Sequence, residues 1–224
     1  MENSLLGLMV GGPRGLLPAD WPSLAPTWAG VDRGTLTLLE AGVAPAFAVG
    51  DFDSQTAAEY AKVRAAVADV ARVAPEKDET DTEMGLRVAF EQSHATRVLV
   101  LGGTGGRLDH LLSNLWLLTQ PRFESYAERV SFVDQQNWID FLLPGAHLLQ
   151  PRPQFRYLGI ANLTAVRSLT ITGAKYALPA WTNGRPFSWA SNEFLGEAPV
   201  RVSFSEGVVA VIRSRDRVGQ TRDN

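Results

Sequence analysis

The sequence predicts an α/β N-terminal domain, with a mainly parallel sheet and crossover helices, followed by a smaller, sandwich-like all-β C-terminal domain. In the first half, short apolar runs alternate with segments of helical periodicity, the order strand, loop, helix that is typical of parallel sheets. From about Gly159 onward the apolar runs are short, turn residues separate them, and no helix-length periodic stretch follows. We place the division between residues 127 and 128, which gives domains at 1–127 and 128–224.

Hydrophobic runs and their spacing locate the elements of the first half. Strands are expected at Leu5–Val10, at Ala46–Val49 and at Arg97–Leu101, each followed by glycine. Apolar residues spaced three and four apart predict amphipathic helices, in which those residues lie on one face. The first of these helices carries Tyr60, Val63, Val67 and Val70. The second begins near Thr82. The third carries Leu108, Leu111, Leu112, Leu115 and Leu118.

The second half yields strands only. Arg129–Val133 is expected to be a further strand of the first sheet, and the stretch Pro144–Gln154, rich in proline and glutamine, is expected to join the domains. Three later runs, Leu169–Thr172, Val200–Phe204 and Val208–Ile212, predict a small antiparallel β domain.

Composition narrows the class of protein. The 21 basic and 24 acidic residues give a formal charge of −3, which does not favour a nucleic-acid or anionic-membrane surface. The chain has no cysteine, so disulfides, thiolate metal sites and a cysteine nucleophile are excluded. No apolar run approaches the ~20 residues that span a bilayer, and the N-terminus is not a cationic leader. We therefore expect a cytoplasmic protein that binds neither nucleic acid nor membrane.

The segment Gly50–Ser54 places two carboxylates, Asp51 and Asp53, directly after a predicted strand. Open α/β sheets carry their sites at the carboxyl ends of strands, and Mg²⁺ prefers one or two carboxylates with substrate phosphates completing its shell. Glycine, aspartate and serine are also common in solvated turns. Spacing alone leaves a metal site and a surface turn about equally open.

The segment Gly102–His110 contains four glycines between a predicted strand and a predicted helix. Glycines let backbone amides approach an anion closely, and a helix N-terminus favours negative charge. A flexible loop in which Asp109 caps the helix explains the aspartate but not four glycines followed by arginine. The segment is not a Walker A loop, because no Gly-Lys-Ser/Thr follows. We therefore expect Gly102, Thr104, Gly105, Gly106 and Arg107 to contact a nucleotide.

Two further aspartates occupy comparable places in the chain. Asp81 lies at a predicted helix start, where capping alone also explains it, and Asp32 follows the apolar run around Trp28. In a parallel sheet both would share one edge with Asp51, Asp53 and Asp109. Crowded carboxylates repel one another unless a cation relieves them. A metal-bound polyphosphate does so, which predicts a magnesium-dependent enzyme that transfers a phosphate-containing group from a nucleotide.

Taken in order, these segments resemble the thiamine pyrophosphokinase (thiamine diphosphokinase) family. Its motifs are Asp-Gly-Gly, Gly-Asp-(Phe/Leu)-Asp-Ser, Thr-Asp, Gly-Gly-Arg-x-Asp-His, Gly-x-Lys-Tyr and Ser-Asn-Glu-Phe. All but the first match in full here, at Gly50–Ser54, Thr80–Asp81, Gly105–His110, Gly173–Tyr176 and Ser191–Phe194. The first motif matches only in Asp32 and Gly34, because Arg33 stands where the family has glycine. The resemblance spans the chain from about Trp28 to Ser214.

The resemblance implies transfer of the pyrophosphoryl group of ATP to the hydroxyl of thiamine, with release of AMP. It implies a catalytic, ATP- and Mg²⁺-binding domain at 1–127 and a thiamine-binding, dimerising domain at 128–224, in a homodimer with sites between subunits. Arg107 would stabilise the moving group, and Asp109 would bind metal or accept the hydroxyl proton. Asp32, Asp51, Asp53 and Asp81 would hold Mg²⁺, Lys77 would contact the nucleotide, and Ser191, Asn192 and Trp189 would contact thiamine.

Three other interpretations are compatible with parts of the sequence. A magnesium phosphatase with an aspartyl nucleophile would use Asp51-Phe52-Asp53, but Gln55 stands where that motif has threonine or valine. An Asp-x-Asp glycosyltransferase would leave Gly105–His110 unexplained. A non-catalytic nucleotide sensor would bind ATP without turnover.

Overall fold

The computed structural model describes residues 4–72 and 79–216, which form two compact units. The first unit comprises the described residues up to Asn114 together with Phe132–Gln135. The second comprises Leu115–Ser131 and the described residues from Gln136 onward. The assignment of catalytic and thiamine-binding roles on either side of residue 127 stays a prediction.

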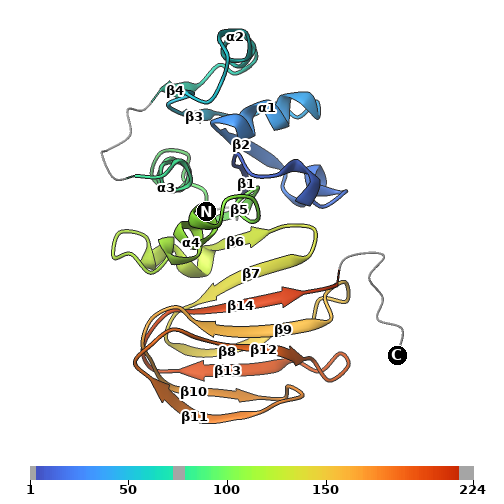
Figure 1. Ribbon diagram of the computed structural model, residues 1–224, viewed down its shortest axis with the longest axis vertical. Coiled ribbons are helices and arrows are strands. Elements are labelled where there is room, and N and C mark those ends of the chain that lie inside the picture. The colour runs from blue at the N-terminus through green and yellow to red at the C-terminus, as the bar shows by residue number, and fades with distance from the viewer. Residues whose placement is uncertain (1–3, 73–78, 217–224) are drawn as a thin grey trace. The chain divides into compact units, whose positions relative to one another are not determined.

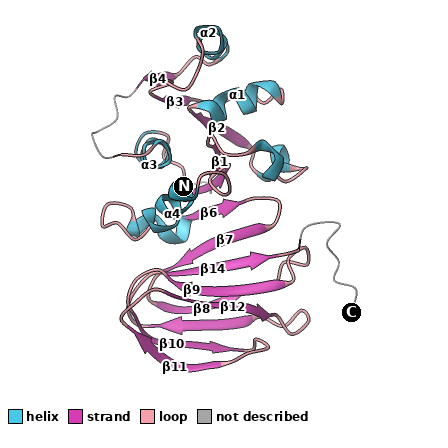
Figure 2. Cartoon of the chain, in the orientation of Figure 1, coloured by secondary structure: helices cyan, strands magenta, loops and turns pink. Residues whose placement is uncertain are grey.

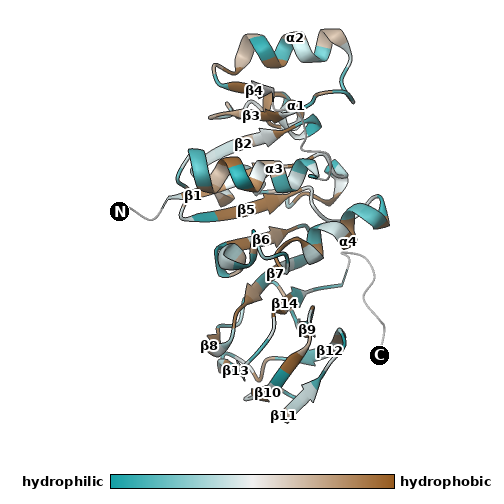
Figure 3. Ribbon diagram, turned by 90° about the vertical axis from the view of Figure 1, so that its left-hand side faces the viewer, coloured by the Kyte–Doolittle hydropathy of each residue, from teal (hydrophilic) through white to brown (hydrophobic). Residues whose placement is uncertain are grey.

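A parallel sheet forms the centre of the first unit (Figure 1). Its strand order is β6-β5-β1-β2-β3-β4, and β1 pairs in parallel with both β2 and β5. The last four residues of β5 are buried, and Figure 3 shows this strand hydrophobic along most of its length. Burial on both faces explains the uninterrupted apolar runs of the sequence. The strands are β1 Leu5–Met9, β2 Thr27–Val31, β3 Ala48–Gly50, β4 Val70–Arg72, β5 Arg97–Leu101 and β6 Val130–Val133.

Helices connect these strands. Helix α1 packs against β1 and β2, whereas α3 packs against β2 and β3, and Figures 1 and 3 place the two helices on opposite faces of the sheet. The α-helices are α1 Arg33–Glu40, α2 Ala57–Ala66, α3 Asp81–Arg87 and α4 Leu108–Leu117. A π-helical turn, Val88–Gln92, continues α3, and short 3₁₀ turns occur at Arg14–Leu16, Trp21–Leu24 and Glu124–Arg129.

Capping boxes start two of the helices. The hydroxyl of Thr80 accepts a hydrogen bond from the backbone N–H of Glu83, and the Glu83 carboxylate accepts one from the backbone N–H of Thr80. Thr56 and Glu59 make the same reciprocal pair at the start of α2. Such boxes satisfy backbone N–H groups that lack intrahelical partners. The start of α3 is thereby fixed at Asp81.

The second unit contains two antiparallel groups of strands, ordered β12-β9-β14-β7 and β11-β10-β13-β8. Figure 2 shows this part of the chain as strands joined by loops. The strands are β7 Asn137–Leu142, β8 Gly145–Leu149, β9 Tyr157–Asn162, β10 Val166–Thr172, β11 Leu178–Asn183, β12 Phe187–Glu193, β13 Val200–Phe204 and β14 Val209–Ser214.

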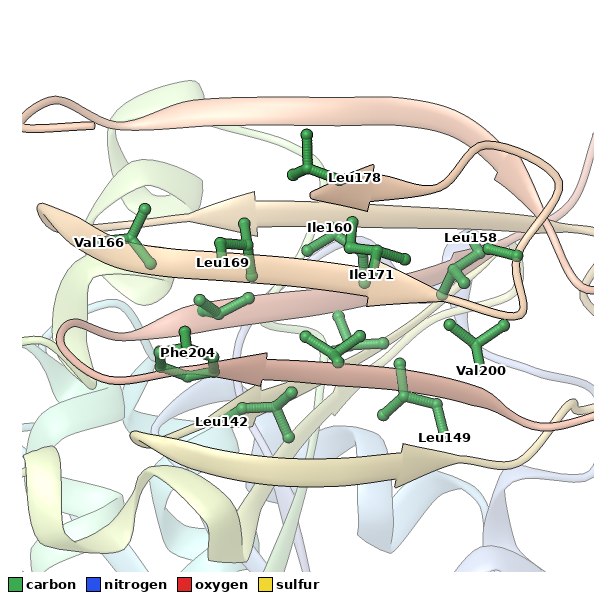
Figure 4. Close-up of a cluster of buried hydrophobic side chains, with 14 residues drawn as sticks. Leu142, Leu149, Leu158, Ile160, Val166, Leu169, Ile171, Leu178, Val200 and Phe204 are labelled. Atoms are coloured by element: carbon green, nitrogen blue, oxygen red, sulfur yellow. The ribbon is translucent and has the colours of Figure 1, made fainter. Parts of the chain in front are cut away.

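Alternating apolar residues from both groups of strands form one core. Leu158 and Ile160 of β9 and Leu169 of β10 are fully buried and belong to a single cluster with residues of five other strands. Figure 4 shows these side chains lying between the strands of the two sheets. Two inner faces with alternating buried residues are the mark of a β-sandwich.

The predicted fold class is confirmed, but three details of the prediction are wrong. Val70 lies in β4, because α2 ends at Ala66 and Val67 is already extended. The predicted linker Pro144–Gln154 contains β8, which pairs with β13 inside the sandwich. Helix α1 was not foreseen. None of the helices in the described part of the chain is long and apolar enough to cross a membrane.

Candidate active site

Polar side chains gather where the parallel strands end. Asp32 follows β2, Asp51 follows β3, Asp81 begins α3, and Gly102 follows β5. The carboxyl ends of parallel strands meet at one edge of a sheet, where open α/β folds place their sites. The first unit therefore has an acidic rim, which we define as Asp32, Asp51, Asp53 and Asp81.

Asp32 is the most enclosed member of the acidic rim, with 8% of its surface exposed. It holds an unusual backbone conformation, with φ of 45° and ψ of −120°. Its Oδ2 accepts a hydrogen bond from the Ser54 hydroxyl at 2.5 Å, whereas its Oδ1 is buried and has no hydrogen-bond partner among the described residues. A buried carboxylate oxygen without a partner is costly. A bound cation would satisfy it.

The turn Asp51–Ser54 presents the next two carboxylates. Phe52 has a φ of 57° and buries its ring against Tyr60, with 5.2 Å between the ring centroids. Anchored there, the chain folds back so that the backbone N–H of Asp53 donates to Oδ1 of Asp51 at 3.1 Å. Asp53 itself is exposed. The turn thus holds the Asp51 carboxylate against the backbone of Asp53.

Asp81 responds electrostatically to the rest of the acidic rim. Although the residue is exposed overall, partial removal of its carboxylate from water, followed by the negative charges of Asp32, Asp51 and Asp53, raises its pKa to about 6. His110 acts in the opposite direction. Asp32, Asp51 and Asp53 thus each lie close enough to Asp81 for their charges to act on it. In the described part of the chain, however, no three Asp, Glu or His side chains are gathered closely enough to hold a metal ion by themselves.

A cavity of about 410 Å³ lies beside Asp81. Its glycine walls depend on close backbone approach: a Cβ on Gly12 would lie 1.9 Å from the carbonyl oxygen of Gly102, which itself has a φ of 77°. The lining residues carry backbone N–H groups, one guanidinium and one imidazole. They include Gly11, Gly12, Gly102, Gly103, Gly105, Gly106, Arg107, His110 and Asn114 as well as Asp81.

Two buried contacts hold the glycine loop in place. The Asn114 side-chain amide donates to the carbonyl of Gly103 at 2.7 Å, and the Thr104 hydroxyl donates to Oδ2 of Asp134 at 2.6 Å. All three side chains are buried. Sequence reasoning missed Asn114 and Asp134, and it expected Thr104 to contact a nucleotide. In the structure the Thr104 hydroxyl supports the loop, and its contact with a nucleotide stays a prediction.

Arg107 and Asp109 form an exposed ion pair. Both Nε and Nη2 of Arg107 donate to the Asp109 carboxylate. These hydrogen bonds raise the pKa of Arg107 and lower that of Asp109. Arg107 lines the cavity, whereas Asp109 is not among its lining residues. The role predicted for Asp109 beside the acidic rim stays a prediction. Lys77 lies outside the described residues.

A second cavity, of about 540 Å³, lies within the β-sandwich unit. Ser191, with a φ of 61°, lines it together with Lys175 and Tyr176, so the two predicted motifs of this unit meet here. Glu193 accepts a hydrogen bond from Nζ of Lys175 at 2.9 Å. That hydrogen bond lowers the pKa of Glu193 and raises the pKa of Lys175.

Asn192 and Trp189 lie differently from Ser191. The Asn192 amide is buried, donates to the carbonyl of Tyr176 at 2.8 Å and accepts from the backbone N–H of Tyr176 at 2.9 Å. It therefore clamps Tyr176 to β12. Trp189 is not a lining residue of the cavity and packs against the sandwich core. Both were expected to contact thiamine, and that role stays a prediction.

Fold and site together define a phosphate-handling α/β enzyme with a β-sandwich unit. Residues 21–129 match the family described as thiamin pyrophosphokinase, catalytic domain, and residues 146–209 match thiamin pyrophosphokinase, vitamin B1 binding domain. The chain belongs to the thiamine pyrophosphokinase family, and the family predicted from its motifs is confirmed.

Individual relatives match over nearly the whole chain. The thiamine pyrophosphokinase of Bacillus subtilis is 33% identical over 216 residues, which cover 94% of this chain and 99% of that protein. A solved structure from Lactobacillus plantarum is 43% identical with a TM-score of 0.88, covering 96% of this chain and all of the other. A thiamin pyrophosphokinase family protein from Enterococcus faecalis is 38% identical, with the same TM-score and the same coverage of both chains.

Proposed function

We propose that this chain is a thiamine diphosphokinase that transfers the pyrophosphoryl group of ATP to the hydroxyl of thiamine, giving thiamine diphosphate and AMP. Family membership over the whole chain supports the activity. The observation that carries the chemistry is the acidic rim beside a glycine-lined cavity. Transfer of this kind depends mostly on positioning and on neutralising phosphate charge.

The residues of the acidic rim fit a divalent cation. Two observations support this fit: Oδ1 of Asp32 is buried without a partner among the described residues, and the pKa of Asp81 is raised by partial burial and then by the charges of Asp32, Asp51 and Asp53. We propose that Asp32, Asp51, Asp53 and Asp81 supply the protein ligands of Mg²⁺, directly or through water. Mg²⁺ usually keeps several waters and takes one or two carboxylates plus phosphate oxygens, so no closed protein cage is required. When bound, Mg²⁺ neutralises charge on the polyphosphate.

The cavity beside Asp81 is the proposed site of the ATP phosphates. Backbone N–H groups of the glycine loop would donate to phosphate oxygens there, as glycine-rich loops do. Arg107 lines this cavity but is paired with Asp109 in the free protein. A phosphate would compete with Asp109 for the planar guanidinium fork. While that pair persists, the lowered pKa of Asp109 makes it a weak proton acceptor, so we assign it mainly to orienting Arg107.

The cavity in the sandwich is the proposed thiamine-binding surface. The Ser191 hydroxyl is exposed at its wall and is suited to the polar edge of a pyrimidine. Asn192 would act through the Tyr176 backbone that it clamps. The homodimer with sites between subunits, and the cytoplasmic location, also stay proposals. Light scattering coupled to size-exclusion chromatography would measure the subunit number.

A product assay separates this proposal from its alternatives. Purified protein is incubated with ATP and Mg²⁺, with and without thiamine, and the nucleotides and phosphate are quantified. The proposal requires AMP and thiamine diphosphate in equal amounts, and only when thiamine is present. Inorganic phosphate without acceptor would indicate a phosphatase, ADP an ordinary kinase, and binding without turnover a sensor. A glycosyltransferase would require a nucleotide sugar.

A further inference from the structure

Arg33, which replaces the glycine usual in the family's first motif, occupies a position that accepts a side chain. It is the first residue of α1 and lies between Asp32 and Gly34. A Cβ on Gly34 would lie 1.9 Å from the carbonyl oxygen of Met9, so that glycine is required by the close approach of α1 to β1. Arg33 has no positive φ, and 43% of its side chain is exposed. An arginine therefore fits here without backbone strain.

The Arg33 guanidinium connects three segments of the first unit. Its Nη1 donates to the carbonyl oxygen of Ser54 at 2.8 Å, and its Nη2 donates to Oε1 of Glu59 at 3.3 Å. The other oxygen of Glu59 accepts from the backbone N–H of Thr56 and closes the capping box of α2. Hydrogen bonds from Thr56 and the Arg33 charge lower the pKa of Glu59, which keeps this partner anionic.

The contact with Ser54 lies at the end of the turn that carries Asp51 and Asp53. The same turn is tied to Asp32 by the Ser54 hydroxyl at 2.5 Å, and the Gln55 amide donates to the carbonyl of Asp32 at 2.9 Å. The Arg33 hydrogen bond is thus a third tie between the start of α1 and the turn.

We propose that Arg33 is a positioning residue that holds the turn Asp51–Ser54 in its cation-binding conformation. This inference rests on the proposed function for its link to the cation. The Ser54 carbonyl and Glu59 each accept from one terminal nitrogen of the guanidinium, and these two contacts direct it toward the turn and α2.

The experiment compares Arg33→Met, which removes the donors and keeps the length, with Arg14→Met as a matched control. Arg14 forms an exposed ion pair with Glu40 at the opposite end of α1. The first measurement is hydrogen–deuterium exchange of residues 51–56 in metal-free protein. Arg33→Met should speed exchange there by about fivefold, the equivalent of one hydrogen bond of ordinary net strength, and Arg14→Met should leave it unchanged.

The second measurement is thiamine diphosphate synthesis as a function of Mg²⁺ concentration. Arg33→Met should raise the half-saturating Mg²⁺ concentration by about fivefold and leave kcat and the KM for ATP at saturating Mg²⁺ near those of the unmodified chain. Glu59→Gln keeps the capping acceptor but removes the charge, and it should also raise the half-saturating Mg²⁺ concentration.

Either measurement can overturn the inference. Unchanged exchange at residues 51–56 in Arg33→Met would remove the positioning role. A raised KM for ATP at saturating Mg²⁺ would instead place the guanidinium on the phosphates. If the unmodified chain makes no thiamine diphosphate, the proposed function fails, but the exchange measurement still decides whether Arg33 holds the turn.

Discussion

The carboxylates of the acidic rim differ in how much of their hydrogen-bonding capacity the chain itself satisfies. Asp32 is buried and has one oxygen bonded to Ser54 and one without a partner among the described residues, whereas Asp53 is exposed. Asp51 accepts a single backbone hydrogen bond. Carboxylates whose charges are not compensated repel one another. Their clustering therefore lowers the stability of the folded chain when no cation is bound. Such a cost at one rim of a sheet is typical of a cation site.

We predict that Asp51→Asn and Asp53→Asn each lower kcat/KM by about 100-fold or more while the protein stays folded. Asparagine keeps the shape of each side chain, and in Asp51→Asn an oxygen can still accept from Asp53, but the negative charge is lost. Steady-state kinetics and circular dichroism would check both statements. The control is Asp20→Asn, an exposed aspartate before the turn Trp21–Leu24, which should keep full activity. Near-normal rates in both rim variants would remove the metal role.

The raised pKa of Asp81 predicts how stability depends on pH in metal-free buffer. Because its folded pKa is about 6 and its ordinary value is 3.8, the native state binds more protons than the unfolded state between these values. Stability should therefore fall as pH rises from about 4 to about 6 and stay lowered above that range. Asp81→Asn should raise Tm at pH 8, with the difference closing below pH 4. A Tm gain that is independent of pH would contradict this cause.

The residues that hold the site in place were the least accessible to sequence reasoning. The aspartates and glycines were found because their types and spacing follow from ion and phosphate chemistry. Asn114 looks like any polar residue of an amphipathic helix, and Asp134 lies 30 residues from the Thr104 hydroxyl that it accepts from. Only the fold brings those groups together. His110 of α4 lines the cavity for the same reason.

At the scale of elements, long apolar runs were located well and short mixed ones were not. The strand Arg97–Leu101 was predicted to the residue, because burial on both faces leaves it a continuous apolar run. Helix α1 was missed because Thr35-Leu36-Thr37-Leu38 alternates with the period of a strand. Val70 continued the spacing of α2 by coincidence and pairs with Ala48 in the sheet. Tertiary packing overrides local pattern in both cases.

A partly buried ion pair joins Arg87 of α3 to Glu79, which precedes the helix, and substitutions should show how much this pair contributes to stability. Nε and Nη2 of Arg87 each donate to Glu79 at 3.1 Å, and the Glu79 side chain is fully buried. Arg87→Met removes both hydrogen bonds from a buried carboxylate, which should cost about 3 kcal/mol of unfolding free energy. The double variant Arg87→Met, Glu79→Gln should recover part of this loss, because no buried charge then remains from the pair.

Urea unfolding would measure both variants of this pair. The exposed pair of Arg167 and Glu206 provides the control, and Arg167→Met should change stability little. A double variant that is less stable than Arg87→Met alone would contradict this prediction. It would show that other interactions of Glu79 stabilise the fold more than its pair with Arg87 does.

For the molecule as a whole, the two units present different chemistry. The first unit carries the acidic rim and the glycine-lined cavity, and the β-sandwich unit carries a cavity lined by Ser191, Lys175 and Tyr176. The family matches fall the same way, with a catalytic domain at residues 21–129 and a vitamin B1 binding domain at residues 146–209. We therefore expect substitutions in the first unit to affect ATP binding and substitutions in the β-sandwich unit to affect thiamine binding.

Binding measurements on single variants would test this division of substrates. Ser191→Ala removes one hydroxyl at the cavity wall, and Asn192→Ala removes the clamp on Tyr176, so each should weaken thiamine binding by about fivefold or more. ATP affinity, measured by calorimetry with Mg²⁺, should be little changed in both. Asp53→Asn should weaken ATP binding and leave thiamine binding little changed, because its carboxylate belongs to the acidic rim.

Asn192→Ala should also lower Tm, since the Asn192 amide is buried, whereas Ser191→Ala should not, since Ser191 is exposed. A loss confined to ATP in the sandwich variants would mean that the β-sandwich serves the nucleotide and not the acceptor.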